Sequence, residues 1–145
     1  MISNIRRTRG FTLLELMIVV LVMSVIAMIA ITSYSRYAYR ARRADGQELL
    51  MRVANAQERY YATFNKYGGD PVTGDLKLGS ATSEKGYYTV TISNTDITKD
   101  YTATATPVPG NSQGKDVCGP LSINSLGVKL PAASDTAMNS NGRCW

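Results

Sequence analysis

One carboxylate, that of Glu15, lies inside the apolar stretch FTLLELMIVV, which follows a short basic stretch ending in Gly10. A carboxylate deep in a bilayer costs on the order of 3 kcal/mol, and less near the end of an apolar helix. This cost is offset when a cation lies beside the carboxylate in a low-dielectric bundle, where their attraction is far stronger than in water. The chemistry open to Glu15 is therefore ion pairing. Because Phe11 begins the run only four residues earlier, snorkelling to the membrane interface is the alternative.

Cys118 and Cys144 are the two cysteines of the chain, which has no histidine. Two cysteines without histidine are too few for a structural metal site, so we expect no metal. Two thiols near the end of a small domain predict a disulfide formed in an oxidising compartment, outside the cytoplasm. Closing a loop of about 27 residues stabilises a fold by roughly 3–4 kcal/mol in the chain-entropy model.

No nucleophile–base pair, phosphate-binding loop or cofactor motif is visible in the sequence, so we expect neither enzyme activity nor a cofactor. The formal net charge is +5, of which Arg6, Arg7 and Arg9 contribute three charges before Gly10. Without them the charge is about +2, which is too small to indicate a nucleic-acid partner.

The apolar run has the length of a membrane span. From Leu16 to Ile31 the only polar residue is Ser24, and counted from Phe11 the run has 21 residues. As a helix it would be roughly 31 Å long, which matches the hydrocarbon core of a bilayer. A secretory signal has a cleavage site of small residues after its apolar region, and no such site follows this run. Cleavage between Gly10 and Phe11 would leave the run on the mature protein.

No Pro or Gly interrupts the chain between Gly10 and Gly46, and the pattern predicts one helix from about residue 11 to about residue 64. Its second half is amphipathic. The predicted apolar face consists of Tyr34, Ala38, Ala41, Leu49, Val53, Ala56 and Tyr60. The predicted charged face consists of Arg40, Arg43, Glu48, Arg52, Glu58 and Arg59.

After the turn-rich GGDPVTGD the period of the sequence changes to two, which is typical of strands. We expect antiparallel strands with one wet face at YYTVTIS (87–93) and YTATATPV (101–108). PLSINSLGVKL (120–130) predicts a third strand, a turn at Asn124 to Gly127, and a short fourth strand. The aromatic group Tyr60, Tyr61, Phe64 and Tyr67 is better explained as packing between helix and sheet than as a ligand site.

The basic leader, the Gly10–Phe11 junction and Glu15 in FTLLELMIVV together resemble the prepilin signature of type IV pilins. RADGQELLMRVANAQERYYATFNKY (43–67), followed by strands and a cysteine pair, is similar to PilE-type minor pilins. The resemblance implies an α+β pilin fold: a long N-terminal helix packed on a small antiparallel sheet with a disulfide-closed C-terminal loop. The implied division is a leader (1–10), a transmembrane or fibre-core half-helix (11–32), an amphipathic half-helix (33–66) and a globular domain (67–145).

The resemblance also assigns roles to residues. Prepilin peptidase would cut after Gly10, Phe11 would become the N-methylated terminus, and Glu15 would lie near the amine of a neighbour's Phe11 in the fibre core. Cys118 and Cys144 would bound a loop on the fibre surface. The family often has Pro at the position of Thr32, where it kinks the helix, whereas Thr keeps the backbone donor and removes the ring clash.

The implied function is that of a minor pilin, held in the inner membrane as a precursor with a periplasmic C-terminal domain. After processing it would enter the pilus or its priming complex, for adhesion or twitching motility. The implied partners are other pilins, the peptidase, the inner-membrane assembly platform and membrane lipid.

Three alternatives stay open. A major pilin would share every N-terminal feature. A type II secretion pseudopilin would share the leader, but the sequence has no acidic calcium-loop cluster near its C-terminus. A DNA-uptake pilin would contact phosphate through the arginines 36, 40, 42 and 43, although such a cluster is more often a solvated or subunit-contacting face. Glu15 argues against a subunit at the extreme tip, because tip subunits of this class tend to lack it.

Overall fold

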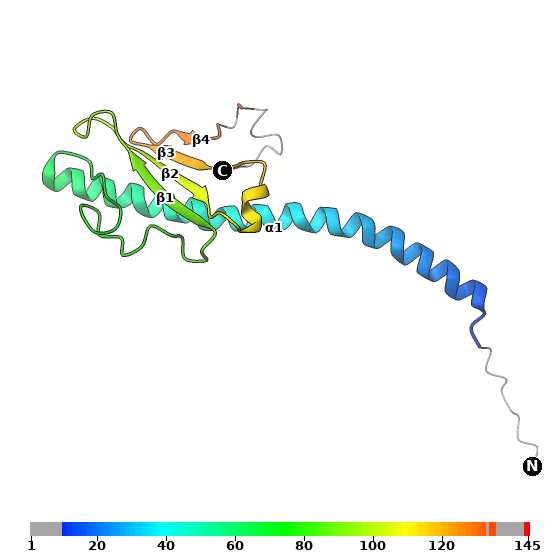
Figure 1. Cartoon of the computed structure of the whole chain (residues 1–145). Coiled ribbons are helices and arrows are strands. Elements are labelled where there is room, and N and C mark those ends of the chain that lie inside the picture. The colour runs from blue at the N-terminus through cyan, green and yellow to red at the C-terminus, as the bar shows by residue number, and fades with distance from the viewer. Residues whose placement is uncertain (1–9, 133, 136–143) are drawn as a thin grey trace, which may run out of the picture. The chain divides into compact units, whose positions relative to one another are not determined.

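A computed structural model describes residues 10–132, 134, 135, 144 and 145. Its elements (Figure 1) are α1 (Leu13–Phe64), β1 (Tyr88–Ser93), β2 (Thr102–Pro107), the 3-10 helix η1 (Ser112–Lys115), β3 (Leu121–Asn124) and β4 (Lys129–Leu130). The chain divides into two compact units, one ending at Tyr37 and the other, the globular unit, spanning Ala38–Trp145. The predicted fold class, a long N-terminal helix packed on a small antiparallel sheet, is confirmed.

α1 is one helix of 52 residues, and its backbone is helical at Thr32. It ends at Phe64, because Asn65 has a left-handed backbone with φ of 53°. The N–H of Asn65 donates to the carbonyl of Tyr61 at 2.8 Å, which completes a common C-terminal cap. The predicted end of the helix is confirmed, and its first residue lies two positions later than predicted.

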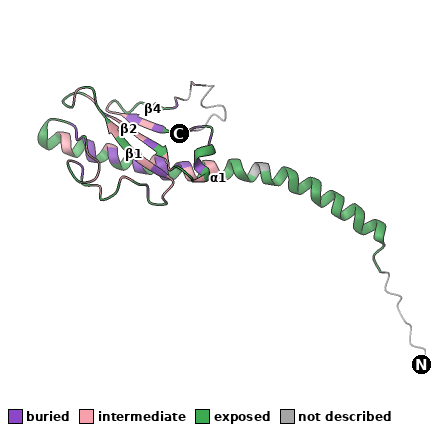
Figure 2. Cartoon of the chain, viewed as in Figure 1, coloured by how far each residue is buried: buried purple, intermediate pink, exposed green. Residues whose placement is uncertain are grey.

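The first part of α1 exposes apolar side chains on all sides, as the burial colours of Figure 2 show. Every residue from 11 to 31 is exposed. Helix α1 is long and apolar enough to cross a membrane, and nothing in its most apolar window of 18 residues is buried. A surface helix of a soluble protein would instead bury an apolar stripe. The exposure is consistent with the predicted membrane or fibre-core segment.

The four strands form one antiparallel sheet whose strand order is the order of the chain, β1-β2-β3-β4. Val90 on β1 lies opposite Ala105 on β2. The turn between β3 and β4 depends on Asn124, whose side-chain oxygen accepts the N–H groups of Leu126 and Val128 at 3.0 and 2.9 Å. The four predicted strands and this turn are confirmed.

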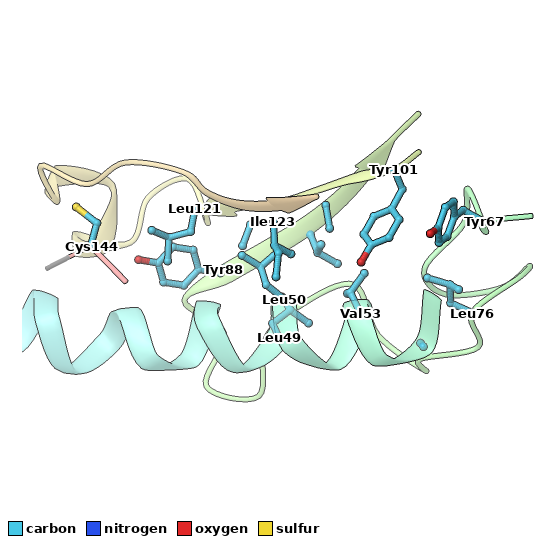
Figure 3. Close-up of a cluster of buried hydrophobic side chains, with 14 of the residues drawn as sticks. Leu49, Leu50, Val53, Tyr67, Leu76, Tyr88, Tyr101, Leu121, Ile123 and Cys144 are labelled. Atoms are coloured by element: carbon cyan, nitrogen blue, oxygen red, sulfur yellow. The ribbon is translucent and has the colours of Figure 1, made fainter. Parts of the chain in front are cut away.

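The core of the globular unit lies between α1 and one face of the sheet (Figure 3). The helix and strands bury Leu49, Leu50, Val53, Ala56, Tyr88, Val90, Ala103, Ala105, Leu121 and Ile123. Close approach of helix and sheet requires glycine at position 46, because a Cβ there would lie 2.9 Å from the ring of Tyr88. The core is therefore shaped around the Tyr88 ring as well as around the aliphatic side chains.

The predicted faces of the helix are wrong at several positions. Tyr34 and Ala41 were expected on the buried face but are exposed, and Leu50 is fully buried although the predicted face omitted it. Arg43, expected on the charged face, is only 3% exposed. Arg43 was assigned to the exposed face because of its charge. That prediction failed because the acidic partner of Arg43 lies in a loop more than 70 residues away in sequence.

Part of the aromatic group joins the end of α1 to the sheet. The rings of Tyr61 and Tyr67 stack with centroids 4.6 Å apart, and Tyr67 lies 4.9 Å from Tyr101, just before β2. Tyr60 and Phe64 form a separate pair at 4.5 Å, and Phe64 is 58% exposed. The predicted packing role is confirmed for Tyr60, Tyr61 and Tyr67, which lie in the core or pack against it, and is wrong for Phe64.

Cys118 and Cys144 form the predicted disulfide, with their Cα atoms 5.6 Å apart and both residues buried. The Nε2 of Gln47 on α1 donates to the carbonyl of Cys144 at 3.0 Å. The disulfide and this hydrogen bond together tie residue 144 to the loop before β3 and to the helix.

Replacing both Cys118 and Cys144 by alanine should lower the free energy of unfolding by about 2–5 kcal/mol, because the unfolded chain regains its loop freedom. Urea unfolding followed by the fluorescence of Trp145, the one tryptophan, measures the change. Reduced wild type should unfold like the double variant, which itself should not respond to reductant. Equal stability of the oxidised wild type and the double variant would contradict the stapling role.

Candidate functional site at the start of α1

The residues predicted to be cleaved, methylated and used in assembly lie at the start of α1. One open pocket of about 350 Å³, a concave surface, is lined by Gly10, Phe11, Thr12 and Glu15. The side chain of Phe11 is 83% exposed, and Glu15 is exposed as well. The predicted cleavage, methylation and assembly residues are thus within reach of one another and of a partner molecule.

Thr12 caps the start of α1, a role that the sequence-based predictions did not include. The Oγ1 of Thr12, the residue before α1, accepts the N–H of Glu15 at 3.2 Å. The spacing Thr-x-x-Glu is that of a capping box, in which side chains satisfy N–H groups that the helix leaves free. The letters TLLE at 12–15 carry this signal, so the sequence could have revealed it.

The helix end alone does not balance the charge of Glu15. Glu15 is the acidic residue of the first turn, where a negative charge gains about 0.3–1 kcal/mol from the helix dipole. A carboxylate in a bilayer core costs roughly 3 kcal/mol. The ion pairs found among the described residues join Arg43 with Asp116 and Lys99 with Asp96, so neither involves Glu15. In an apolar bundle a cation from another molecule would compensate the carboxylate, and snorkelling to the membrane interface is the alternative in a bilayer.

The four arginines between residues 36 and 43 do not act as one cationic surface. Arg43 makes a buried bidentate ion pair with Asp116, with both N–O distances 2.6 Å. Arg42 donates to the hydroxyl of Ser112 and lies 5.1 Å from the ring centroid of Tyr87. Arg36 and Arg40 remain exposed. The predicted solvated or subunit-contacting face is therefore wrong for Arg43, which belongs to the core.

A buried polar network surrounds that ion pair. The Nε2 of Gln113, in η1, donates to the hydroxyl of Tyr88 and to Asp116, both at 2.9 Å. Burial raises the pKa of Tyr88 to about 12, so this phenol stays neutral near pH 7. Asp45 is also buried, and it accepts the N–H of Lys85 at 3.0 Å. These contacts fasten two loops to α1 and have the character of structural links rather than of a reactive site.

Within residues 10–132, 134, 135, 144 and 145, no group of three or more His, Cys, Asp or Glu side chains is placed to hold a metal ion. Several aspartates instead accept hydrogen bonds from backbone N–H and hydroxyl groups: Asp45, Asp70, Asp75, Asp96 and Asp100. Hydrogen bonds from Thr73 and the N–H of Val72 lower the pKa of Asp70, for example.

Two family models match the chain. Residues 5–31 match the prokaryotic N-terminal methylation motif, and residues 32–122 match the model described as type IV minor pilin ComP, DNA uptake sequence receptor. Among solved structures, the chain is similar to a type IV pilin from Shewanella oneidensis, with 27% sequence identity and a TM-score of 0.52. That similarity covers 74% of this chain and 97% of the Shewanella chain. No protein of curated function matches.

Proposed function

The chain belongs to the type IV minor pilin family of ComP, and from this premise we propose that it is made as a prepilin, cut between Gly10 and Phe11, methylated at Phe11 and assembled through Glu15. The observation that carries the proposal is the coincidence of the N-terminal methylation motif, residues 5–31, with the concave surface shared by these three residues.

Cleavage creates the cation that Glu15 needs. A new, methylated amine on Phe11 is positively charged near pH 7, and in the fibre core it would lie beside the Glu15 of a neighbouring subunit. The attraction is strong because both groups are taken out of water. Each subunit carries one amine and one carboxylate, so the pair also sets the register in which subunits join. The exposed apolar side chains of residues 11–31 would be covered by the same segment of neighbouring subunits.

The location follows the same division of the chain. We propose a leader (1–10), a membrane and later fibre-core segment (11–32), an amphipathic half-helix (33–66) and a globular domain (67–145) in the periplasm and then on the pilus. The buried disulfide supports an oxidising compartment for the last of these. The partners would be prepilin peptidase, lipid of the inner membrane, the assembly platform and the other pilins of the fibre, which serves adhesion or motility.

Intact-mass spectrometry of sheared surface filaments tests the proposal. The expected mass is that of residues 11–145 plus one CH2 for the methylation and minus two hydrogens for the disulfide, so one measurement reports cleavage, methylation and the disulfide together. A much smaller amount than that of the dominant subunit agrees with a minor pilin. A full-length mass found only in membranes would contradict the proposal.

DNA binding is a second candidate function, favoured by the description of the family model that matches residues 32–122. The test is fluorescence anisotropy of labelled duplex DNA with the full chain in detergent. Phosphate contacts predict that the affinity falls steeply as the salt concentration rises from roughly 50 to 200 mM. No binding to genomic fragments of the source organism at low salt would remove this function and leave the pilin assignment intact.

Replacing Glu15 by glutamine should leave cleavage and membrane insertion intact but lower incorporation into filaments by about tenfold or more, because the buried amine loses its charged partner. Glutamine is also a capping-box residue at this position, so this variant removes the charge and leaves the capping pattern in place. The amount of the chain in sheared filaments, divided by its amount in membranes, measures the effect.

The control for the Glu15 experiment is Thr12→Ala, which removes the cap bond and keeps the carboxylate. Losing the cap costs about 1 kcal/mol at the helix end. Incorporation near the wild-type level is expected for Thr12→Ala. If Glu15→Gln assembles normally while Thr12→Ala does not, Glu15 acts through helix capping and the ion-pair role is wrong.

A further inference from the structure

Tyr34, Arg36 and Tyr37 form an exposed aromatic and basic cluster directly after the apolar run. The side chains of Tyr34 and Tyr37 are 74% and 71% exposed, and Arg36 is exposed as well. Two large aromatic residues this exposed at helical spacing contribute nothing to a core. The cluster belongs to the unit that ends at Tyr37, whereas the buried Arg43 belongs to the globular unit.

Arg36 has no acidic partner on its own helix. The positions three and four residues away hold Thr, Ser, Tyr and Arg, so no i,i+3 or i,i+4 ion pair can form. The ion pairs found among the described residues do not include it either. Arginine presents a planar fork of donors that fits a phosphate group with two hydrogen bonds. The guanidinium is therefore free to bind an anion from outside the chain.

The position of the cluster along the helix selects the source of that anion. Arg36 lies five residues after Ile31, a rise of about 7.5 Å, and the polar layer of a bilayer is roughly 5–7 Å thick on each side. Helical side chains lean toward the N-terminus of their helix, which here is toward the apolar run. Both tyrosine rings then fall where aromatic residues gather at a membrane surface.

We propose that Arg36, flanked by Tyr34 and Tyr37, binds the phosphate of an anionic phospholipid headgroup in the leaflet at the C-terminal end of the apolar run. The inference rests on the proposed membrane-inserted precursor and adds a ligand class and a site to it. The site holds the precursor at a fixed depth until the subunit is extracted, and the anionic headgroup supplies a counter-charge that Arg36 does not find among the described residues. Assembly into the fibre then exchanges this lipid for neighbouring subunits.

Native mass spectrometry of the full chain tests the lipid site. The chain is placed in mixed micelles with equal amounts of phosphatidylglycerol and phosphatidylcholine, and the lipids retained on the protein are counted. Wild type should retain phosphatidylglycerol preferentially, and Arg36→Gln should lower that retention about fivefold, as expected for one basic residue near an anionic surface. Arg36→Lys should keep most of the preference. Arg59→Gln, which removes an exposed arginine far along the same helix, is the matched control and should change nothing.

Three results would overturn the lipid site: equal retention by wild type and Arg36→Gln, the same loss in Arg59→Gln, or displacement of the lipid by millimolar inorganic phosphate. Loss of duplex DNA binding in Arg36→Gln with unchanged lipid retention would assign the arginine to DNA instead. Carbonate extraction of cell membranes separates the two proposals. A chain that is not retained in membranes defeats the proposed precursor, whereas a retained chain with Arg36-independent lipid binding defeats the lipid site alone.

Discussion

Replacing Gly10 by valine is expected to leave the full-length chain in the membrane, with processing slowed by about 100-fold or more. A peptidase must bring its catalytic groups to the Gly10–Phe11 bond, and a misplacement of about 1 Å can cost a factor of this size. The structure isolates this effect from folding, because a Cβ added at Gly10 would meet no atom within 4 Å. Intact-mass analysis of the membrane fraction reads the ratio of full-length to processed chain.

Gly69→Val is the matched control for Gly10→Val. A Cβ at Gly69, in the globular unit, also meets nothing within 4 Å, and this glycine does not need a left-handed backbone. Normal processing is expected for this control. Normal processing of Gly10→Val as well would move the cleavage site away from residue 10.

Replacing Asp116 by alanine is expected to lower the free energy of unfolding by about 3–5 kcal/mol, because it leaves the guanidinium of Arg43 buried without a counter-charge. The side chains of Arg43 and Asp116 are only 4% and 1% exposed, so water cannot replace the lost partner. Asp116 also accepts the side-chain amide of Gln113 at 2.9 Å, and that bond is lost too. Urea unfolding of the full chain in detergent measures the change.

The double variant Arg43→Met with Asp116→Asn tests the cause of that loss. It removes both charges and keeps an acceptor for Gln113, so it should be more stable than Asp116→Ala alone. A loss below about 1 kcal/mol for Asp116→Ala would mean that the pair is screened like a surface ion pair. A double variant less stable than Asp116→Ala would mean that Arg43 acts through the packing of its side chain.

Periodicity predicted the elements of this chain well, because each element carries its own pattern. The long helix lacks Pro and Gly up to Gly46, and β1 and β2 alternate Thr with Tyr, Val, Ile or Ala. The helix end, the four strands and the disulfide were all predictable. The capping residue Thr12 and the apolar run after it, at the start of α1, also carry local patterns, although the capping box was not predicted.

Long-range polar contacts could not be predicted, because neither partner carries a local signal. The ion pair of Arg43 and Asp116 joins residues 73 positions apart. Gln57, fully buried, similarly holds both the N–H and the carbonyl of Gly68 through its side-chain amide, at 2.8 and 2.7 Å. From sequence alone, a polar residue on a helix is predicted to face solvent, because the loop that packs on it is not yet known. The proposed function of this chain depends on exposed residues, whereas these buried polar residues contribute to its stability.

The order of the strands has a consequence for how the globular unit folds. Because β1 to β4 lie in the sheet in the order of the chain, each hairpin closes a short loop and can form rapidly. The inner face of such a sheet is apolar, and a small sheet needs a helix packed on it for independent stability. Gly46 of α1 and Tyr88 of β1, which approach closely in the core, are separated by about forty residues, so we expect docking of α1 to close a longer loop and to follow the hairpins. Between these two steps the sheet carries an open apolar face, and this is the interval in which a chaperone would act on the chain.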